Sequence, residues 1–379
     1  MTAVAEFTGG LLALLLAGHR VVRAASALGA RLGLSPMVIG LTIVAAGTSA
    51  PELAVVGQAI AVDDTELAVG SIIGSNIANV LLVLGIASLL GAIHVTSRVV
   101  RIDIPVMIAA SALFLLFALD GTLGRVDGVI LFGGLVLFVT WTLQATRRRP
   151  NRGDVEASTR ALSGGATDAA PAGPSLARVI VELVGGIAVL AVAARFVVSG
   201  AEEIARSLGV PELIVGLTIV ALGTSAPEIV TTLVAAFQGR RDLAVGNAVG
   251  SNIFNILLVL GVAGMLAPSG ISVSEDALQL DLPILLAAAI ACLPIVAWDH
   301  TLNRWEGAIF VSYYAAYLVF LVLDATGHRA KDPFALIMLG FVLPLTIITA
   351  ATVVLRKRRQ RALPAGPDES APAEDTTVG

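Results

Sequence analysis

A carboxylate occurs twice in this chain at the end of the same hexapeptide, GTSAPE, which closes at Glu52 and again at Glu228. In each copy a threonine stands four residues before the acid, so Thr48 and Glu52 share one helix face, as do Thr224 and Glu228. Glycine and proline within the motif weaken the helix and free backbone carbonyls. The pattern therefore predicts two interrupted, oxygen-rich helices, each carrying one acid.

A second duplicated motif, GSNI, repeats the same four-residue spacing, with Ser75 before Asn79 and Ser251 before Asn255. All of these side chains offer oxygen, and none is His or Cys. Oxygen-only sites suit hard cations: Ca2+ takes about 6–8 oxygen ligands, and Na+ accepts the same ligand type. A transition-metal site would instead show imidazole or thiolate groups.

The composition places these motifs in a membrane. The 379 residues are 56% hydrophobic and 14% charged, whereas soluble domains are about a quarter charged. The apolar residues form runs of about 20, the length that crosses a bilayer. The single cysteine, Cys292, excludes an intramolecular disulfide. The fold class is therefore an all-α polytopic membrane protein, with the lipid bilayer as its surroundings and no sign of a nucleic-acid partner.

A buried carboxylate has an energetic consequence in such a setting. An ionised acid at the centre of a membrane helix costs about 3 kcal/mol on insertion scales. Two of them at symmetric positions require compensating Ca2+, Na+ or protons. Competition among these cations for two carboxylates is a physical basis for antiport.

The motifs belong to an internal repeat. Residues 40–86 align with 216–262 at a constant offset of 176, without gaps, and 27 of the 47 positions are identical. Each copy occupies the second and third helices of a set of five. Because five is odd, the two sets cross the membrane in opposite senses, which is the inverted-repeat plan of many secondary transporters.

Apolar runs predict ten core helices and an eleventh after them. The predicted spans are 5–28, 36–61, 68–91, 103–119, 126–146, 178–205, 211–237, 243–267, 278–297, 306–324 and 333–355. The predicted domains are an N-terminal repeat (1–146), a flexible cytoplasmic linker (147–177), a C-terminal inverted repeat (178–327), the extra helix (333–355) and a tail that is basic and then disordered (356–379).

The distribution of basic residues predicts the orientation. With the N-terminus outside, the cytoplasmic segments hold most of the 24 Lys and Arg residues, including the cluster 356–361. An eleventh span keeps that cluster on the cytoplasmic side. We therefore expect a multi-pass protein of the plasma membrane with its C-terminus in the cytoplasm.

The repeated GTSAPE and GSNI segments resemble the two alpha-repeats of the sodium/calcium exchanger family, within the cation/Ca2+ antiporter superfamily. The resemblance extends to the ten-helix plan and implies exchange of Ca2+ for Na+ without a cofactor. It also implies a ligand set. Glu52, Glu228 and the carbonyls of Thr48 and Thr224 would hold Ca2+; Ser49, Ser225, Ser75, Ser251 and the carbonyls of Ala45 and Ala221 would complete flanking Na+ sites; Asn79 and Asn255 would line the centre.

This chain departs from the family pattern at Asn255, where many members carry Asp, so only two central carboxylates remain. That leaves room for coupling to protons, or to K+, in place of Na+. A passive Ca2+ channel and an intramembrane enzyme with paired acids are further alternatives. The inverted repeat favours alternating access over a channel, and the lack of a nearby His or Lys disfavours an enzyme. Asp103 and Asp281, which precede prolines near helix starts, are expected to cap those helices.

Overall fold

The computed structural model describes residues 2–62, 64–148, 175–210, 215, 218, 221–297 and 300–328. Within these residues the regular secondary structure is helical apart from four two-residue strands. The predicted linker lies almost wholly outside the described residues, and so do the predicted eleventh helix and the tail. The polytopic all-α class is confirmed, since eight described helices are long and apolar enough to span a membrane and two shorter apolar ones accompany them.

The first repeat contains five membrane-crossing units, three of which include a π-helical segment (η). Its elements are α1 (Thr2–Leu32); α2 (Pro36–Ile39), η1 (Gly40–Val44), α3 (Ala45–Thr48) and α4 (Ala50–Ala61); α5 (Thr65–Ile77), η2 (Ala78–Val83) and α6 (Leu84–Leu90); β1 (Ile93–His94); η3 (Val99–Asp103) and α7 (Ile104–Ala118); β2 (Thr122–Leu123); and α8 (Arg125–Arg148).

The second repeat follows the same order. Its described elements are α10 (Leu176–Ser207); α12 (Ala221–Thr224) and α13 (Ala226–Phe237); α14 (Arg241–Phe254), η5 (Asn255–Leu260) and α15 (Gly261–Leu266); β3 (Ile271–Ser272); η6 (Ala277–Asp281) and α16 (Leu282–Ala297); β4 (Thr301–Leu302); and α17 (Arg304–Ala325). The predicted spans match these helices to within a few residues at their described ends.

The π-helical segments recur at equivalent places in the two repeats. η2 and η5 interrupt the third helix of each set, and η3 and η6 begin the fourth. Pro105 and Pro283 stand two residues after the ends of η3 and η6, and a proline cannot donate to the carbonyl four residues earlier. A wider π turn accommodates that missing bond, and such turns are frequent at functional sites.

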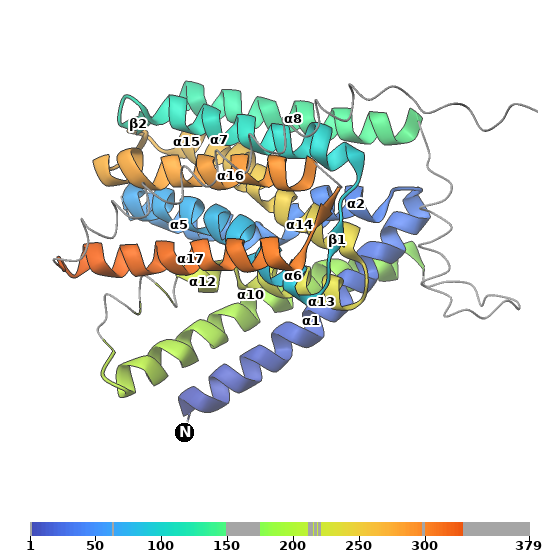
Figure 1. Cartoon of the computed structure of the whole chain (residues 1–379), viewed down its shortest axis with the longest axis horizontal. Helices are drawn as coiled ribbons and strands as arrows, with labels where there is room; N and C mark the ends of the chain where they lie inside the picture. The colour runs from blue at the N-terminus through green and yellow to red at the C-terminus, as the bar shows by residue number, and fades with distance from the viewer. Residues whose placement is uncertain are drawn as a thin grey trace, which may run out of the picture.

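Two small antiparallel strand pairs join the repeats reciprocally. β1 pairs with β4, with Ile93 opposite Leu302, and β2 pairs with β3, with Leu123 opposite Ile271. Each repeat thus contributes the strand after its third helix to one pair and the strand after its fourth helix to the other. β1 and β2 lie toward opposite ends of the long axis in Figure 1, as an inverted repeat requires.

Helices α1 and α10 form a layer of their own. They are the first helix of each repeat, and they run side by side, slanted below the other helices in Figure 1. α10 also lies against both helix breaks. A Cβ at Gly47 would collide with Ile187, and one at Gly223 with Val198, both on α10. Glycine at these two positions therefore allows a helix to pack directly over the interrupted segments.

Candidate ion-binding site

Both GTSAPE motifs break their helices at the serine. α3 ends at Thr48 and α4 begins at Ala50, while Ser49 between them has φ −77° and ψ 0°. Ser225 takes nearly the same conformation, φ −84° and ψ 3°, between α12 and α13. Proline stands in the first positions of each new helix, where its missing N–H costs no intrahelical bond.

Each glutamate therefore lies in the first turn of a half-helix, Glu52 in α4 and Glu228 in α13. Both side chains are fully buried. One oxygen of Glu52 and both oxygens of Glu228 have no hydrogen-bond partner of normal geometry among the described residues. A buried acid without partners is costly, so these oxygens are available to a cation or a proton.

Ser75 connects the two repeats at the centre of the site. Its hydroxyl donates to Glu52 Oε1 at 3.3 Å and accepts from Ser225 Oγ at 2.8 Å. It also accepts from Asn255 Nδ2 at 3.2 Å. Thus Glu52 and Ser75 from the first repeat meet Ser225 and Asn255 from the second.

Thr48 makes a second connection between the repeats. Its Oγ1 lies 3.3 Å from Ser251 Oγ of the second repeat and 3.3 Å from the Ala45 carbonyl of its own helix. Thr48, Ala45 and Ser251 are all fully buried. The structure therefore brings Thr48 against Ser251, as it brings Ser75 against Ser225.

Three further candidates have buried polar atoms without partners among the described residues. These atoms are Ser49 Oγ, Asn255 Oδ1 and both amide atoms of Asn79. Thr224 differs from Thr48 because it is only half-buried. Ala221 begins α12, beside the second break. All twelve predicted residues lie on the two broken helices or on the third helices of their sets.

The chemistry of this cluster is that of an oxygen cage with two negative charges. In the part of the chain that the structure describes, no group of three or more His, Cys, Asp or Glu side chains could hold a metal ion. The ligands present are carboxylate, hydroxyl, amide and carbonyl oxygens, which suit Ca2+ and Na+. The arrangement therefore offers the ligand types that hard cations prefer.

Sequence reasoning missed four buried polar residues beside this cluster. Asn76 accepts a hydrogen bond from Asn255 at 3.0 Å. Asn247 donates to both Thr231 and Thr232. Asn76 stands inside the repeated GSNI motif and could have been noticed there. The other three occur at positions where the repeats differ, so the duplication gave no signal for them.

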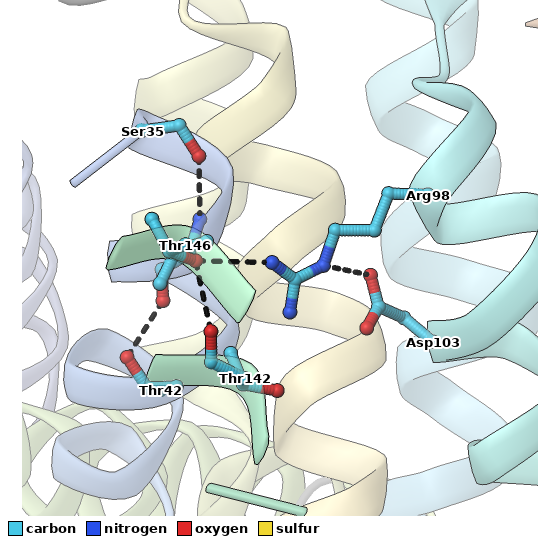
Figure 2. A network of polar contacts seen from close by, with 7 residues as sticks. Ser35, Thr42, Arg98, Asp103, Thr142 and Thr146 are labelled. Carbon is cyan, nitrogen blue, oxygen red and sulfur yellow. Dashed lines mark hydrogen bonds and ion pairs between the residues drawn. The ribbon is translucent and has the colours of Figure 1, made fainter. Parts of the chain in front are cut away.

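The expected capping role of Asp103 is wrong. Asp103 makes no side-chain cap and is held by Arg98, whose Nε lies 3.6 Å from its Oδ2. Figure 2 shows the Arg98 guanidinium between Asp103 and Thr146 of α8, to which it donates at 3.2 Å. Asp281, at the equivalent place in the second repeat, accepts from Tyr317 at 3.1 Å. Both acids thus link the fourth helix of a set to the fifth, away from the central cluster.

Fold and site together define a class: a multi-pass membrane transporter with inverted repeats and a buried cluster of acidic and polar side chains at their interface. Comparison with known proteins identifies the family. The model of the sodium/calcium exchanger protein family matches residues 2–144 and 179–323. The chain therefore belongs to the sodium/calcium exchanger family, which confirms both the predicted resemblance and a transporter rather than an enzyme.

Individual relatives agree with this assignment. The candidate antiporter CaxA of Alkalimonas amylolytica is 38% identical over 81% of this chain and 95% of its own length. The sodium/calcium exchanger MaX1 of Methanosarcina acetivorans is 32% identical over 82% of this chain and 96% of its own length. The solved structure of the sodium-calcium exchanger NCX_Mj, soaked with 2.5 mM Na+ and 0.1 mM Ca2+, is 26% identical with a TM-score of 0.70, and the match covers 84% of this chain and 98% of that one.

Proposed function

We propose that the protein exchanges Ca2+ for Na+ across the membrane by alternating access, with Glu52 and Glu228 as its two charged ligands. One observation carries the proposal: two fully buried carboxylates, one from each repeat, stand at helix breaks with oxygens that have no hydrogen-bond partner of normal geometry in the described part of the chain. Family membership supports exchange of Ca2+ against another cation, and the relative MaX1 is named a sodium/calcium exchanger.

The proposed ligand assignment is the one that the family resemblance implies, and its residues lie on the two broken helices and the third helices of their sets. Ca2+ would sit between Glu52 and Glu228, with the carbonyls of Thr48 and Thr224 completing its shell. Na+ ions would occupy flanking positions made by the following groups: the hydroxyls of Ser49, Ser225, Ser75 and Ser251 and the carbonyls of Ala45 and Ala221. Asn79 and Asn255 would line the space between these positions, where their unpartnered atoms are available.

Charge balance explains why the two ions would exclude each other. Two carboxylates are neutralised by one Ca2+ or by two Na+, and either occupant removes most of the cost of burying the acids. Simultaneous occupancy would place four positive charges against two negative ones in a low-dielectric site. The empty site is also costly, so the protein changes conformation most easily when one kind of cation is bound, which couples the two fluxes.

Protons are the second candidate for the coupling ion. The specific observation in their favour is Asn255, which leaves two acids where many family members have three. Two protons neutralise two carboxylates as well as two Na+ do. Coupling to protons would use Glu52 and Glu228 but not the flanking hydroxyls.

The distribution of Lys and Arg residues supports a proposal for the orientation of the protein in the membrane. The protein would lie in the plasma membrane with its N-terminus outside and its C-terminus in the cytoplasm, since the cytoplasmic segments would then hold most Lys and Arg residues. A reporter fused after Gly379 should be protected from protease added outside intact cells. Digestion of that reporter would contradict the orientation or the eleventh span.

The test is uptake of radioactive Ca2+ into proteoliposomes under an imposed gradient of Na+, K+ or H+, one gradient at a time. Outwardly directed Na+ should drive Ca2+ accumulation above equilibrium, and K+ or H+ alone should not. Ca2+ accumulation driven only by an H+ gradient would show that protons, and not Na+, are the coupling ion. Ca2+ equilibration without any counter-ion gradient would favour a channel.

A further inference from the structure

The second repeat contains a buried polar cluster that the first repeat lacks. Asn247 Nδ2 donates to Thr231 Oγ1 at 2.9 Å and to Thr232 Oγ1 at 3.0 Å. All three side chains are at most 1% exposed. At the equivalent positions of the first repeat, the two threonines are replaced by Val55 and Val56 and the asparagine by serine.

The orientation of the Asn247 amide is fixed by its neighbours. The Thr231 hydroxyl has one hydrogen, and it donates that hydrogen within its own helix, to Pro227 O at 2.7 Å and more weakly to Glu228 O at 3.2 Å. Toward Asn247 it can therefore only accept, so the amide atom beside it must be the NH2 group. The amide oxygen then points the other way, where it accepts from Thr48 Oγ1 at 3.4 Å.

A directed series of hydrogen bonds follows. Thr48 also has one hydrogen, and with the Asn247 oxygen available that hydrogen need not go to the Ala45 carbonyl. Having donated it, Thr48 can only accept from Ser251, 3.3 Å away. The hydroxyl hydrogen of Ser251 is then directed to Thr48, and the remaining lone pairs of Ser251 are free for a cation.

We propose that Asn247 is a positioning residue: by accepting the hydrogen of Thr48, its amide oxygen leaves the Ala45 carbonyl free to face a flanking Na+ ion as an acceptor. The inference rests on the proposed function, because the Ala45 carbonyl belongs to the proposed Na+ ligands. Without Asn247, Thr48 would direct its hydrogen to the Ala45 carbonyl and compete with Na+ for that oxygen. Asn247 itself touches no ion.

The experiment measures the Na+ and Ca2+ concentrations for half-maximal exchange in proteoliposomes, for wild type and for Asn247→Ser, the residue of the first repeat. One neutral hydrogen bond changes affinity by a few-fold to about tenfold. We expect the half-saturating Na+ concentration to rise about fivefold, while that for Ca2+ changes less than about twofold. Asn252→Ser is the matched control, because Asn252 is a buried amide on the same helix whose amide donates to Met107 Sδ at 3.3 Å; it should change neither value.

A second variant keeps the test decisive if Asn247→Ser does not assemble. Thr231→Val introduces the first-repeat residue and removes the acceptor that fixes the amide, so it should raise the half-saturating Na+ concentration about two- to threefold. Unchanged Na+ dependence in these variants, or equal shifts for Na+ and Ca2+, would overturn the positioning role. Wild-type exchange without any Na+ dependence would instead overturn the proposed function.

Discussion

The two repeats are close to identical in the segments that build the site, yet their side chains are bonded differently. Asn255 donates to Ser75 and Asn76, whereas neither amide atom of the equivalent Asn79 has a partner among the described residues. Thr48 is fully buried and its equivalent Thr224 is half-buried. Similar sequences therefore adopt similar breaks but different surroundings.

The same asymmetry appears where each repeat meets the layer of α1 and α10. The turn between α13 and α14 is fastened to α1: Gln238 bonds to His19 at 2.9 Å, and Arg240 donates to the Val22 carbonyl at 3.0 Å and to Ser26. Asp64, the first-repeat counterpart of Arg240, caps its own helix at Leu67 N. Inverted halves in unequal conformations are what alternating access requires, since a symmetric molecule would be open to both sides or to neither.

The largest expected effect tests whether the repeats are equivalent where their sequences are. Glu52→Gln and Glu228→Gln should each reduce Ca2+ exchange by more than about a hundredfold, because losing one buried charge partner costs several kcal/mol. Uptake assays on reconstituted protein measure this, and an unchanged gel-filtration profile verifies folding. Near wild-type transport by either variant would show that the two acids are not a pair.

The second prediction compares the two central asparagines, Asn255 and its first-repeat equivalent Asn79. Asn255→Asp adds a third acid, so the site can bind one more positive charge when it is occupied by Na+. The rate of Ca2+ uptake should then depend several-fold more on membrane potential, or its dependence on pH should shift. One elementary charge moving through 100 mV is worth about 2.3 kcal/mol. Uptake with the potential clamped by K+ and valinomycin measures the difference.

Asn79→Asp is the natural comparator for that experiment. An Asp at 255 would lose the two donor contacts to Ser75 and Asn76, whereas an Asp at 79 loses no hydrogen bond seen among the described residues. Both variants should raise the dependence on potential, with a greater loss of rate for Asn255→Asp. If wild-type flux already depends strongly on potential and neither variant alters it, counting acids does not explain the coupling.

A smaller effect is expected from removing the hydrogen bonds of Arg240 to α1. Burial, and then the charge of Arg23, lowers the pKa of the Arg240 guanidinium, which reflects how far this side chain is withdrawn from water. Arg240→Gln should speed hydrogen exchange in α1 around residues 19–32 and change the transport rate about two- to threefold, because hydrogen bonds to a charged donor are lost. Asp64→Asn, the first-repeat control, should leave exchange in α10 unaltered. Equal rates of amide hydrogen exchange in wild type and Arg240→Gln would show that the hydrogen bonds of Arg240 do not restrain α1.

Local, duplicated features were predictable from the sequence. The breaks at Ser49 and Ser225 follow from Gly and Pro in a short motif, and the burial of Glu52 and Glu228 follows from their place in apolar runs. The inverted arrangement follows from a repeat in sets of five helices. Each of these features depends on residues near one another in the chain or on the number of helices in a repeat. None of them requires knowledge of which side chains meet in the folded protein.

Contacts between the repeats were not predictable. Asn247 meets Thr48 across about half the chain, and only the folded arrangement of α3 against α14 brings them together. Asp103 was expected to cap a helix, but Arg98, five residues earlier, reaches it across the π turn. The hydrogen-bond or ion-pair partner was set by helix packing in the first case and by a π turn in the second. The spacing of residues along a regular helix does not predict either.

The smallest expected effect concerns the segment that joins the repeats. The two halves already hold each other through β1 with β4, β2 with β3 and the packing of α1 on α10. Residues 153–172 contain no candidate ligand and lie outside the described residues. Deleting them should therefore leave Ca2+ uptake within about twofold of wild type, since a shorter connection changes loop entropy only slightly. A variant with 153–172 replaced by Gly and Ser at equal length separates a need for length from a need for sequence. Loss of transport in both variants, with normal expression, would mean that this segment acts on the repeats directly and that their mutual contacts do not suffice.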